Sequence, residues 1–496
     1  MKSSAMAGNK RRASIDKSHI CPLPLFRTED CPAFVPAAGY RNGTELNNRG
    51  TNGNYWSSSL NDNNSNNAYN LNFNDDNHDW NNNNRNNGHS VRPVSELAFS
   101  DSSLFLFRLS PQQLLIDLYK AYKDARKHKR KKNHQLVFEL DYEEELVNLR
   151  DELIARTYCP RTSTCFIVKD PKQREIFAAE FRDRVVHHLY YNYTCELFER
   201  TFIADSYSCR RNKGTHYGFR RLGHHVRSIS NNYTRKCYVM RIDIKGYFMH
   251  INRWRLLNIC IDSLKKMAMR PSDVAGVRWC EKLDYELLFY LSRVIIMNNP
   301  VKDCKRLGSY ADWRGLPHDK SLFYSEKGCG LPIGNLTSQL FSNVYMNVFD
   351  CHVKRNISNV AYGRYVDDAF FISPYKSNLR GVVAHIKYFL KKELGLEMHP
   401  NKFYIKEARL GIEFLGGYYK PYRYYIANNS LMRLRRKVNE LDADVGARKL
   451  QASVNSFLGV LSHYSTYSIR KELFSGITFL QDYGFFTPGF KKFNIK

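Results

Sequence analysis

The stretch that decides the fold is YGRYVDDAFFIS, residues 362–373. Two apolar segments flank the adjacent carboxylates Asp367 and Asp368, and this pattern predicts a β-hairpin with both aspartates at its tip. Neighbouring carboxylates between hydrophobic strands repel each other unless a cation neutralises them. Because an Asp-Asp turn alone is most often an ordinary solvated turn, the pair indicates a site only when further groups join it.

A third carboxylate comes from a second predicted strand. YVMRIDIKGYF, residues 238–248, reads as a strand that ends at Asp243 and is followed by a tight Lys-Gly turn. If this strand lies beside the hairpin, Asp243 and Asp367 could hold two Mg²⁺ ions about 3.5–4 Å apart. Mg²⁺ suits such a site because it takes oxygen ligands and keeps substrate phosphates in its octahedron. The three carboxylates therefore predict phosphoryl-transfer chemistry.

Composition and charge indicate a nucleic-acid partner. The 496 residues allow two to four domains, and the 43% hydrophobic and 14% aromatic content is ample for a core. Residues 1–100 hold ten Lys+Arg and nine Asp+Glu, a net of +1, so +27 of the total +28 lies in residues 101–496. A basic body with interleaved Tyr and Phe is typical of nucleic-acid binding, and a generic basic protein is the alternative.

The cysteines and the first residues exclude several classes. Twelve cysteines are scattered without any C-x-x-C pair, which argues against a zinc cluster and against a disulfide framework. Residues 1–12 are polar and basic and lack the apolar core of a signal peptide. No apolar run reaches transmembrane length. We expect a soluble, reduced, cytoplasmic protein that contacts no membrane.

The order of the predicted elements favours the α+β class. Strands and helices do not alternate regularly, so we expect an antiparallel sheet and not a doubly wound parallel one. Helices are predicted at 111–132, 142–158, 183–200, 253–299 and 430–480, and short strands at 163–181, 237–243, 362–373 and 412–427.

Five ordered segments resemble the palm motifs of a reverse transcriptase. They are RIDIKGYF (241–248), GLPIGNLTSQ (330–339), RYVDD (364–368), LGLEMHPNK (394–402) and GIEFLGGY (411–418), and KDPKQREIF (169–177) resembles the fingers motif. The resemblance covers about residues 105–480. It implies a right-hand polymerase fold, with fingers and an antiparallel palm in 99–425 and a basic helical thumb in 426–496. The implied activity is RNA-directed DNA synthesis.

The resemblance assigns the metal-binding and sugar-selecting residues by position. Asp243, Asp367 and Asp368 resemble the catalytic triad that binds two Mg²⁺ ions, with Mn²⁺ as an alternative. Phe248 resembles the steric gate, an aromatic ring that would clash with a ribose 2′-hydroxyl. An ordinary core aromatic is the other interpretation of Phe248.

The same resemblance assigns the nucleotide-binding residues. Lys172 and Arg174 resemble the clamp on the triphosphate, where a guanidinium can bind phosphate as a fork. A surface ion pair is the alternative for both. Ile333 and Gly334 would lie against the base and sugar of the incoming nucleotide. Lys402 is a candidate for protonating the leaving pyrophosphate.

One signature narrows the resemblance. The I-G-x-x-x-S-Q pattern at 333–339 is similar to the reverse transcriptases of diversity-generating retroelements, whereas group II intron and retron enzymes commonly carry glutamine in place of the isoleucine. Isoleucine can only pack against the nucleotide, whereas a polar amide could donate a hydrogen bond to it. Losing such a positioning hydrogen bond weakens the discrimination between correct and incorrect base pairs by about 1–2 kcal/mol. This subtype implies error-prone copying at template adenines by a bacterial or phage-encoded enzyme. Its partners would be template RNA, a DNA or RNA primer, dNTPs and a small basic accessory protein.

Residues 1–98 form an asparagine-rich, low-complexity region. Asparagine is a poor helix and strand residue, so we expect this region to be disordered. Residues 33–95 resemble the C-terminal part of a C-type-lectin-like variable domain. Asparagine codons begin with two adenines and end in a pyrimidine, so a template for adenine mutagenesis would be translated as asparagine. We predict a translated template repeat, with a plain polar linker as the alternative.

Two other classes remain open. A group II intron-like or retron-like reverse transcriptase with an RNA-binding or splicing role would be favoured by an extended basic domain after the thumb, and only residues 481–496 follow Leu480. A lectin-like binding protein with a degenerate polymerase is the other alternative. The complete set of three aspartates argues against degeneracy.

Overall fold

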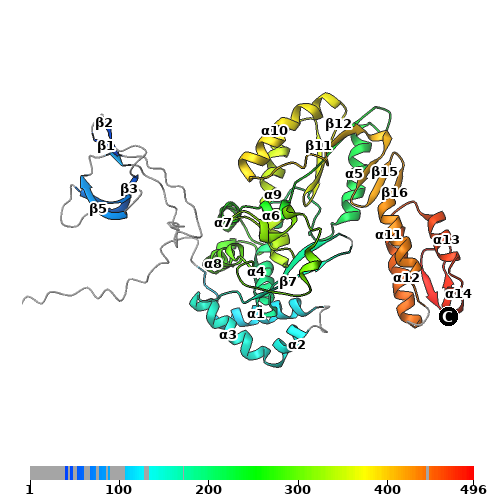
Figure 1. Cartoon of the computed structure of the whole chain (residues 1–496), viewed down its shortest axis with the longest axis horizontal. Coiled ribbons are helices and arrows are strands. Elements are labelled where there is room, and N and C mark those ends of the chain that lie inside the picture. Colours follow the sequence, from blue (N-terminus) through cyan, green and yellow to red (C-terminus); the bar gives the residue numbers. More distant parts are fainter. Residues whose placement is uncertain are drawn as a thin grey trace, which may run out of the picture. The chain divides into compact units, whose positions relative to one another are not determined.

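The computed structural model describes residues 107–127, 133–170, 172–442 and 446–496, and the backbone of six strands between residues 40 and 89. The chain divides into two compact units, residues 1–100 and residues 101–496. The larger unit is α+β, as the sequence predicted, with an antiparallel palm sheet and a helical thumb (Figure 1). No helix in the described part of the chain is long and apolar enough to cross a bilayer.

The palm is a four-stranded sheet with the order β11-β12-β9-β13, and every neighbouring pair is antiparallel. Its strands are β9 (Tyr238–Asp243), β11 (Ala361–Tyr365), β12 (Asp368–Ser373) and β13 (Tyr404–Glu407). After its first residue β12 is buried throughout, which explains its unbroken apolar sequence. The predicted hairpin and the predicted strand ending at Asp243 are both confirmed.

Helices cover both faces of the palm sheet. Phe370 and Ile372 of β12 join one hydrophobic cluster with residues of α5. The intervening Phe371 lies against Tyr362, and Tyr362 lies against Phe349 of α9 with ring centroids 6.0 Å apart. Successive side chains of a strand point to opposite faces, so the two sets belong to two layers. The covering helices are α5 (Thr215–Ile229), α9 (Leu336–Asn356) and α10 (Lys376–Leu394).

The fingers contain the predicted two strands around a turn. They are β7 (Ser163–Val168) and β8 (Arg174–Ala178), and β10 (Cys304–Arg306) pairs with β7 in parallel. The surrounding helices are α1 (Pro111–Arg126), α2 (Asn133–Leu140), α3 (Tyr142–Ala155), α4 (Phe181–Glu199), α7 (Arg253–Ala268) and α8 (Tyr285–Met297). The prediction of one helical stretch over 253–299 was wrong between 269 and 284, where Pro271 cannot continue a helix. The basic run at 128–132 lies outside the described residues.

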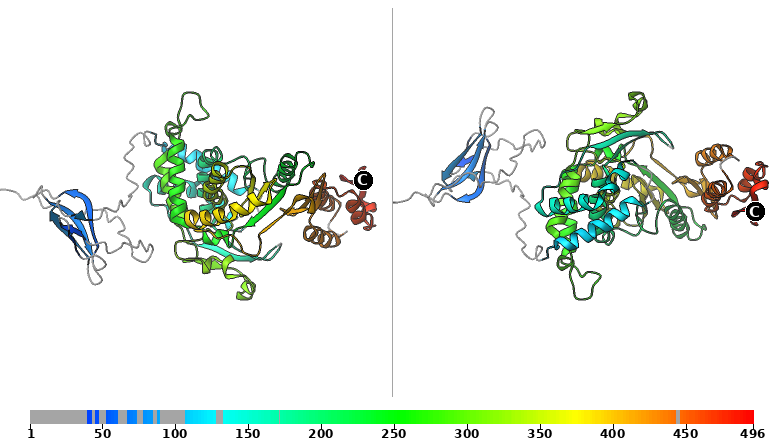
Figure 2. Two further views of the ribbon diagram at one scale, coloured as in Figure 1. Left: turned by 90° about the horizontal axis from the view of Figure 1, so that it is seen from above. Right: turned by 90° about the horizontal axis from the view of Figure 1, so that it is seen from below.

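The thumb has its own hydrophobic core, which contains Leu434, Leu458 and Phe474. Its elements are α11 (Asn428–Asn439), α12 (Ala447–Ser462), α13 (Tyr467–Ser475), α14 (Leu480–Tyr483), β17 (Gly484–Phe486) and β18 (Phe493–Ile495). A small sheet of β14 (Ile412–Phe414), β15 (Gly417–Lys420) and β16 (Arg423–Ile426) precedes it. The thumb, orange to red in Figure 2, is a lobe of its own. The helical tail is confirmed, whereas the terminal hairpin was not predicted.

The asparagine-rich unit contains strands where the sequence analysis predicted disorder. They are β1 (Tyr40–Asn42), β2 (Glu45–Asn47), β3 (Gly53–Leu60), β4 (Asn67–Phe73), β5 (His78–Asn84) and β6 (Gly88–His89), in sheets of order β2-β1-β6 and β3-β4-β5. In the sequence of β4, NAYNLNF, apolar residues at positions 69, 71 and 73 alternate with asparagines at positions 70 and 72. This period of two is a strand signal that the composition concealed. The rest of residues 1–98 lies outside the described residues.

A buried ion pair joins the palm hairpin to α9. The side chains of Arg364 and Asp350 are each 1% exposed. Arg364 donates from Nε and Nη2 to the two carboxylate oxygens of Asp350, at 2.7 and 2.6 Å, and from Nη1 to the carbonyl oxygen of Val366 at 2.8 Å. The hydroxyl of Tyr362 donates to the same carboxylate at 2.7 Å. Burial alone would lower the pKa of Arg364, but the adjacent Asp350 holds it above the ordinary value.

We predict that Asp350→Asn lowers the free energy of unfolding by about 3–5 kcal/mol, because it leaves the Arg364 guanidinium buried without a carboxylate. Urea unfolding followed by circular dichroism measures the change. The matched control is Glu196→Gln, which removes an exposed i,i+4 partner of Arg200 and should cost about 0.5 kcal/mol or less. Equal losses in the two variants would contradict the prediction.

Candidate active site

Three carboxylates meet where β9 ends and the hairpin β11–β12 turns. Asp368, the first residue of β12, is the direct cross-strand partner of Asp243. Asp367 lies in the two-residue turn between Tyr365 and Asp368, and its carbonyl oxygen accepts a hydrogen bond from the backbone N–H of Ile244 at 3.2 Å. The structure therefore brings the three predicted aspartates together. Like charges at directly opposed strand positions are destabilising, so this arrangement requires compensation.

The turn that carries Asp367 has a strained backbone. Val366 has φ +56°, a conformation that β-branched residues rarely adopt. Two-residue hairpin loops need positive φ, and a non-glycine residue there costs about 1–3 kcal/mol. The hydrogen bond from Arg364 to the Val366 carbonyl oxygen holds this conformation. The buried arginine thus determines where the Asp367 carboxylate lies.

Two cations neutralise two of the three carboxylates. Arg241 donates from Nε and Nη2 to Asp368 at 2.8 and 2.6 Å, and from Nη1 to the carbonyl oxygen of Glu413 at 3.0 Å. The Lys402 ammonium lies 2.9 Å from Oδ1 of Asp243. Among the described residues, none forms an ion pair with Asp367. Of the three aspartates, Asp367 therefore has the weakest charge compensation.

Burial and like charge change the acidity of the hairpin carboxylates. Burial, followed by the charge of Asp243, raises the pKa of Asp367 to about 6. Burial also raises the pKa of Asp368, although the hydrogen bonds from Arg241 oppose the shift. A carboxyl group shifted in this way beside other carboxylates is typical of a functional site. An added cation would relieve both the repulsion and the cost of burial.

The donor set fits a hard divalent cation, but the three aspartates are not equivalent. Within the described part of the chain, no three His, Cys, Asp or Glu side chains form a ready-made metal-binding group. Both oxygens of Asp368 accept hydrogen bonds from Arg241, and Lys402 donates to one oxygen of Asp243. Carboxylate oxygens are the ligands that Mg²⁺ and Mn²⁺ prefer. Asp367 and the second oxygen of Asp243 are the donors without a cationic partner.

The residues predicted to contact the nucleotide lie beside one hydrophobic cluster. Phe248 in α6 (Tyr247–His250) and Ile333 both pack against the cluster that contains Phe177 of β8. The carbonyl oxygen of Phe248 accepts from the N–H of Leu331 at 2.9 Å, and that of Ile333 accepts from the N–H of Phe177 at 2.8 Å. Residues 331–333 therefore connect α6 to the fingers hairpin.

Gly334 is required by a close backbone approach. It has φ +131°, and a Cβ atom there would lie 2.8 Å from the carbonyl oxygen of Phe177 and 2.9 Å from Cγ2 of Ile176. Both the conformation and the space favour glycine. A structural role thus accounts for Gly334, and its contact with a nucleotide stays a prediction.

The predicted triphosphate clamp lies on the fingers hairpin. Lys172 and Arg174 are exposed, and neither forms an ion pair within the described ranges. Burial raises the pKa of Tyr365, and Arg174 lies close enough to oppose this shift. The clamp arginine is therefore near the residue that precedes the aspartate turn. At the tip of the same hairpin Asp170 lies 2.9 Å from Lys437 of α11, so the fingers contact the thumb.

The family model for reverse transcriptase (RNA-dependent DNA polymerase) matches residues 169–418, which is half of the chain. The chain belongs to the reverse transcriptase family. The match runs from the fingers hairpin through the carboxylate site into β15, and it confirms the family indicated by the ordered motifs. The enzyme class of the family is RNA-directed DNA polymerase, and its domains use divalent metal ions. A second model, a domain of unknown function, matches residues 27–94.

Solved telomerase structures are similar to this reverse transcriptase at a low level. Apo telomerase from Candida tropicalis, truncated from its C-terminal domain, is 11% identical with a TM-score of 0.40, over 54% of this chain and 55% of that chain. Telomerase from Candida albicans in complex with a TWJ fragment of telomeric RNA is 10% identical with a TM-score of 0.39, over 69% and 60%. This reverse transcriptase thus spans less than two thirds of those chains. No curated protein matches it.

Sequence reasoning missed one charged residue of the carboxylate site and one of the fingers hairpin. Arg241 lies two residues before Asp243 in a predicted strand, so the period of two placed both on one face and could have identified it. Glu175 is buried and accepts hydrogen bonds from Trp313 Nε1 at 2.7 Å and from Ser321 Oγ at 2.9 Å. Its partners follow it by 138 and 146 residues, so no local pattern could have indicated them.

We predict a pH-dependent gain in stability for Asp367→Asn in EDTA. The folded protein retains the Asp367 proton up to a pKa of about 6, whereas an unfolded aspartate loses it near pH 4. This group therefore favours folding below about pH 4, and the contribution is lost as the pH rises through 6. The free energy of unfolding of the variant should exceed that of wild type by about 3 kcal/mol at pH 8 and equal it near pH 4.

Urea unfolding at both pH values measures this difference. Asp151→Asn is the control, because Asp151 is exposed and the hydrogen bond from Arg150 lowers its pKa, so this substitution should give no gain in stability at pH 8. The assignment fails if Asp367→Asn is less stable than wild type at pH 8.

Proposed function

We propose that this reverse transcriptase copies template RNA into DNA with divalent ions held at Asp243 and Asp367. The observation that carries the proposal is the meeting of three carboxylates at paired strand ends, one of them without an ion pair. When bound, two Mg²⁺ ions, or Mn²⁺ in their place, would lower the pKa of the primer hydroxyl and stabilise the leaving pyrophosphate. Asp368 becomes a ligand if its carboxylate leaves Arg241.

Lys402 has two successive roles in this proposal. Without metal its ammonium neutralises Asp243, from which it lies 2.9 Å away. A divalent ion on the same carboxylate would repel the ammonium and free it to turn toward the substrate. The freed Lys402 is the chain's candidate for donating a proton to the leaving pyrophosphate. Lys172 and Arg174 would bind the triphosphate from the fingers side, with the guanidinium as a fork.

Phe248 is the proposed steric gate. Its half-buried ring packs on the cluster below β8, and its carbonyl oxygen is bonded to Leu331, so the ring has a defined place. A fixed ring can exclude a ribose 2′-hydroxyl, whereas a mobile one could move aside. Extension with ribonucleotides by Phe248→Ala is the direct measurement of this role.

The thumb and the fingers would hold the template–primer duplex by its backbone. Helix α11 carries a basic run, RLRRK at residues 433–437, and most of the net charge of +28 lies outside residues 1–100. Recognition of an RNA-containing duplex relies on shape and phosphate contacts, which a basic lobe can supply without reading sequence. The ion pair between Asp170 and Lys437 would close the lobe over the duplex.

For the subtype we infer a diversity-generating retroelement enzyme that miscopies template adenines. The support is Ile333, whose apolar side chain packs in a hydrophobic cluster and can only pack against a nucleotide. A group II intron- or retron-like enzyme with an RNA-binding role is the alternative. A small basic accessory protein and the cytoplasm of a bacterial or phage-infected cell belong to the same proposal.

Residues 33–95 are proposed to be a translated template repeat. The asparagine content supports this, because adenine-rich codons are the substrate of such mutagenesis. The strands between 40 and 89 and the domain-family match at 27–94 also favour a small folded domain encoded by the same DNA. A near-identical repeat in the flanking DNA that differs only at adenines would support the template proposal, and its absence would oppose it.

We predict that Asp243→Asn and Asp367→Asn each lower primer extension on an RNA template at least about a thousand-fold, because each removes a charged metal ligand. Extension should require Mg²⁺ or Mn²⁺ and stop in EDTA. The matched control is Asp151→Asn, an exposed residue of α3 that pairs only with its neighbour Arg150. Extension by either site variant at the rate of the control would exclude the proposed mechanism.

We predict that Ile333→Gln lowers misincorporation opposite template adenine about ten-fold. A hydrogen bond from the amide to the nucleotide should favour the correct over the incorrect pair by about 1–2 kcal/mol. The isoleucine has no group for proton transfer, so synthesis should remain readily measurable. Sequencing of cDNA made by both enzymes on one RNA gives the error rates. The proposed subtype would be excluded if wild-type errors were not enriched at adenine or if both enzymes had equal error rates. Neither result would affect the assignment as a polymerase.

A further inference from the structure

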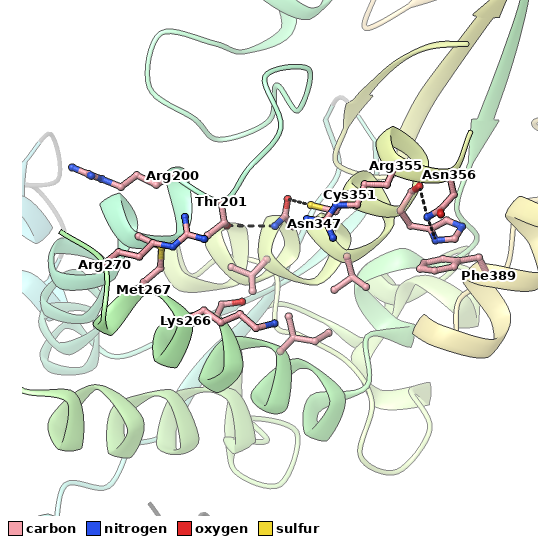
Figure 3. Close-up of a pocket in the computed structure, with 15 residues that line it drawn as sticks. Arg200, Thr201, Lys266, Met267, Arg270, Asn347, Cys351, Arg355, Asn356 and Phe389 are labelled. Atoms are coloured by element: carbon pink, nitrogen blue, oxygen red, sulfur yellow. Dashed lines mark hydrogen bonds between the residues drawn. The ribbon is translucent and has the colours of Figure 1, made fainter. Parts of the chain in front are cut away.

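A basic cavity lies between helices around the fingers and helices that cover the palm sheet, and the three site carboxylates do not line it. It has a volume of about 590 Å³ and lies between the end of α4, one face of α7, one face of α9, and α10 (Figure 3). None of the residues around it belongs to the predicted metal, sugar or triphosphate sites. Cavities of about 300–1,000 Å³ suit small-molecule ligands, so one nucleotide is within its capacity.

The charge around this cavity has one sign. Its lining includes Arg200, Lys266, Arg270 and Arg355 and contains no aspartate or glutamate. Arg200 pairs with Glu196, whereas the other three cations form no ion pair among the residues that the structure describes. All four are exposed and therefore line the mouth. Three uncompensated cations around one opening repel one another and attract an anion.

The interior of the cavity is neutral and partly aromatic. Phe389 stacks on His352, with ring centroids 3.9 Å apart and an interplanar angle of 23°. Asn347 donates to Thr201 Oγ1 at 3.4 Å and accepts from Cys351 Sγ at 3.7 Å, so its amide is held in place. Aromatic faces bind unstacked bases, and amides can bond base edges. Cations at the mouth and an aromatic, amide-bearing interior match the two ends of a nucleotide.

We propose that this cavity binds one unpaired nucleotide of an RNA strand, with its phosphates on Lys266, Arg270 and Arg355 and its base beside Phe389. The proposal goes beyond the polymerase reaction, because it adds an RNA contact that the carboxylate site does not use. A free nucleotide has the same chemistry, and an acidic peptide would match only the cations. The test separates these sources.

The test compares two triple variants of equal charge. The cavity variant is Lys266→Gln/Arg270→Gln/Arg355→Gln, and the control is Arg380→Gln/Lys387→Gln/Lys391→Gln, three exposed cations of α10 that do not line the cavity. The probe is a fluorescein-labelled twenty-nucleotide oligouridylate, measured by anisotropy with the polymerase cleft saturated by unlabelled RNA–DNA duplex. The Kd of the cavity variant should be at least about ten-fold above that of the control, and the slope of log Kd against log salt should fall by about 1.4 for the two phosphates that flank one nucleotide.

Equal Kd values for the two variants would overturn the proposal. The proposal would also be overturned if the cavity variant lost affinity for polyglutamate and kept its affinity for the RNA. If millimolar UMP binds at the cavity and both variants have equal affinity for the RNA, the ligand is a free nucleotide and not an RNA strand. Phe389→Leu, which keeps the charge, should weaken RNA binding and leave polyglutamate binding unchanged.

Primer extension on a short duplex separates this proposal from the polymerase assignment. Both triple variants should extend it at the wild-type rate, because neither changes the carboxylate site. Loss of extension in the cavity variant alone would show that the cavity belongs to the polymerase cleft and would overturn its independence. If the triple variant does not fold by circular dichroism, Lys266→Gln and Arg355→Gln are tested singly, each with about a two- to three-fold rise in Kd as the expected result.

Discussion

The buried guanidinium of Arg364 is the contact on which the active-site geometry depends. It bonds both oxygens of Asp350 in α9 and the carbonyl oxygen of Val366 in the hairpin turn. A charge removed from water is tolerated only when its hydrogen-bonding geometry is nearly complete, so these bonds leave the arginine little freedom. The turn therefore keeps its positive φ, and Asp367 is presented beside Asp243 before any substrate or metal arrives. The position of the Asp367 carboxylate is thus set from the protein interior.

The site itself is a balance of charges that is incomplete without a cation. Arg241 and Lys402 compensate Asp368 and Asp243, and Asp367 is left as a half-buried carboxyl with a raised pKa. Backbone strain and like-charge repulsion both reduce stability, and both are concentrated at these few residues, as is common at functional sites. Such a site favours metal binding, because a bound divalent ion would reduce the like-charge repulsion that destabilises the folded protein without metal.

Two of the basic regions that the structure describes in the larger unit differ in chemistry. The basic run of α11 in the thumb is open and suits a duplex backbone, which is recognised by shape and phosphate. The cavity between α4, α7, α9 and α10 is lined by an aromatic ring and an amide as well as by cations, which suits a single nucleotide. Together they would let the enzyme hold the copied duplex and a separate part of its RNA at the same time.

The sequence by itself determined the palm hairpin, the strand that ends at Asp243, the fingers hairpin and the reverse transcriptase family. These features depend on alternation within a few residues and on motifs in a fixed order, both of which are local properties of the chain. Composition alone misjudged the asparagine-rich unit, where the period of two in β4 predicts a strand. Tertiary structure alone decided that Glu175 joins the fingers hairpin to Trp313, 138 residues later, and that cations from three separate segments surround one cavity. Such contacts depend on how helices and sheets pack, because packing brings together side chains whose spacing in the sequence carries no signal.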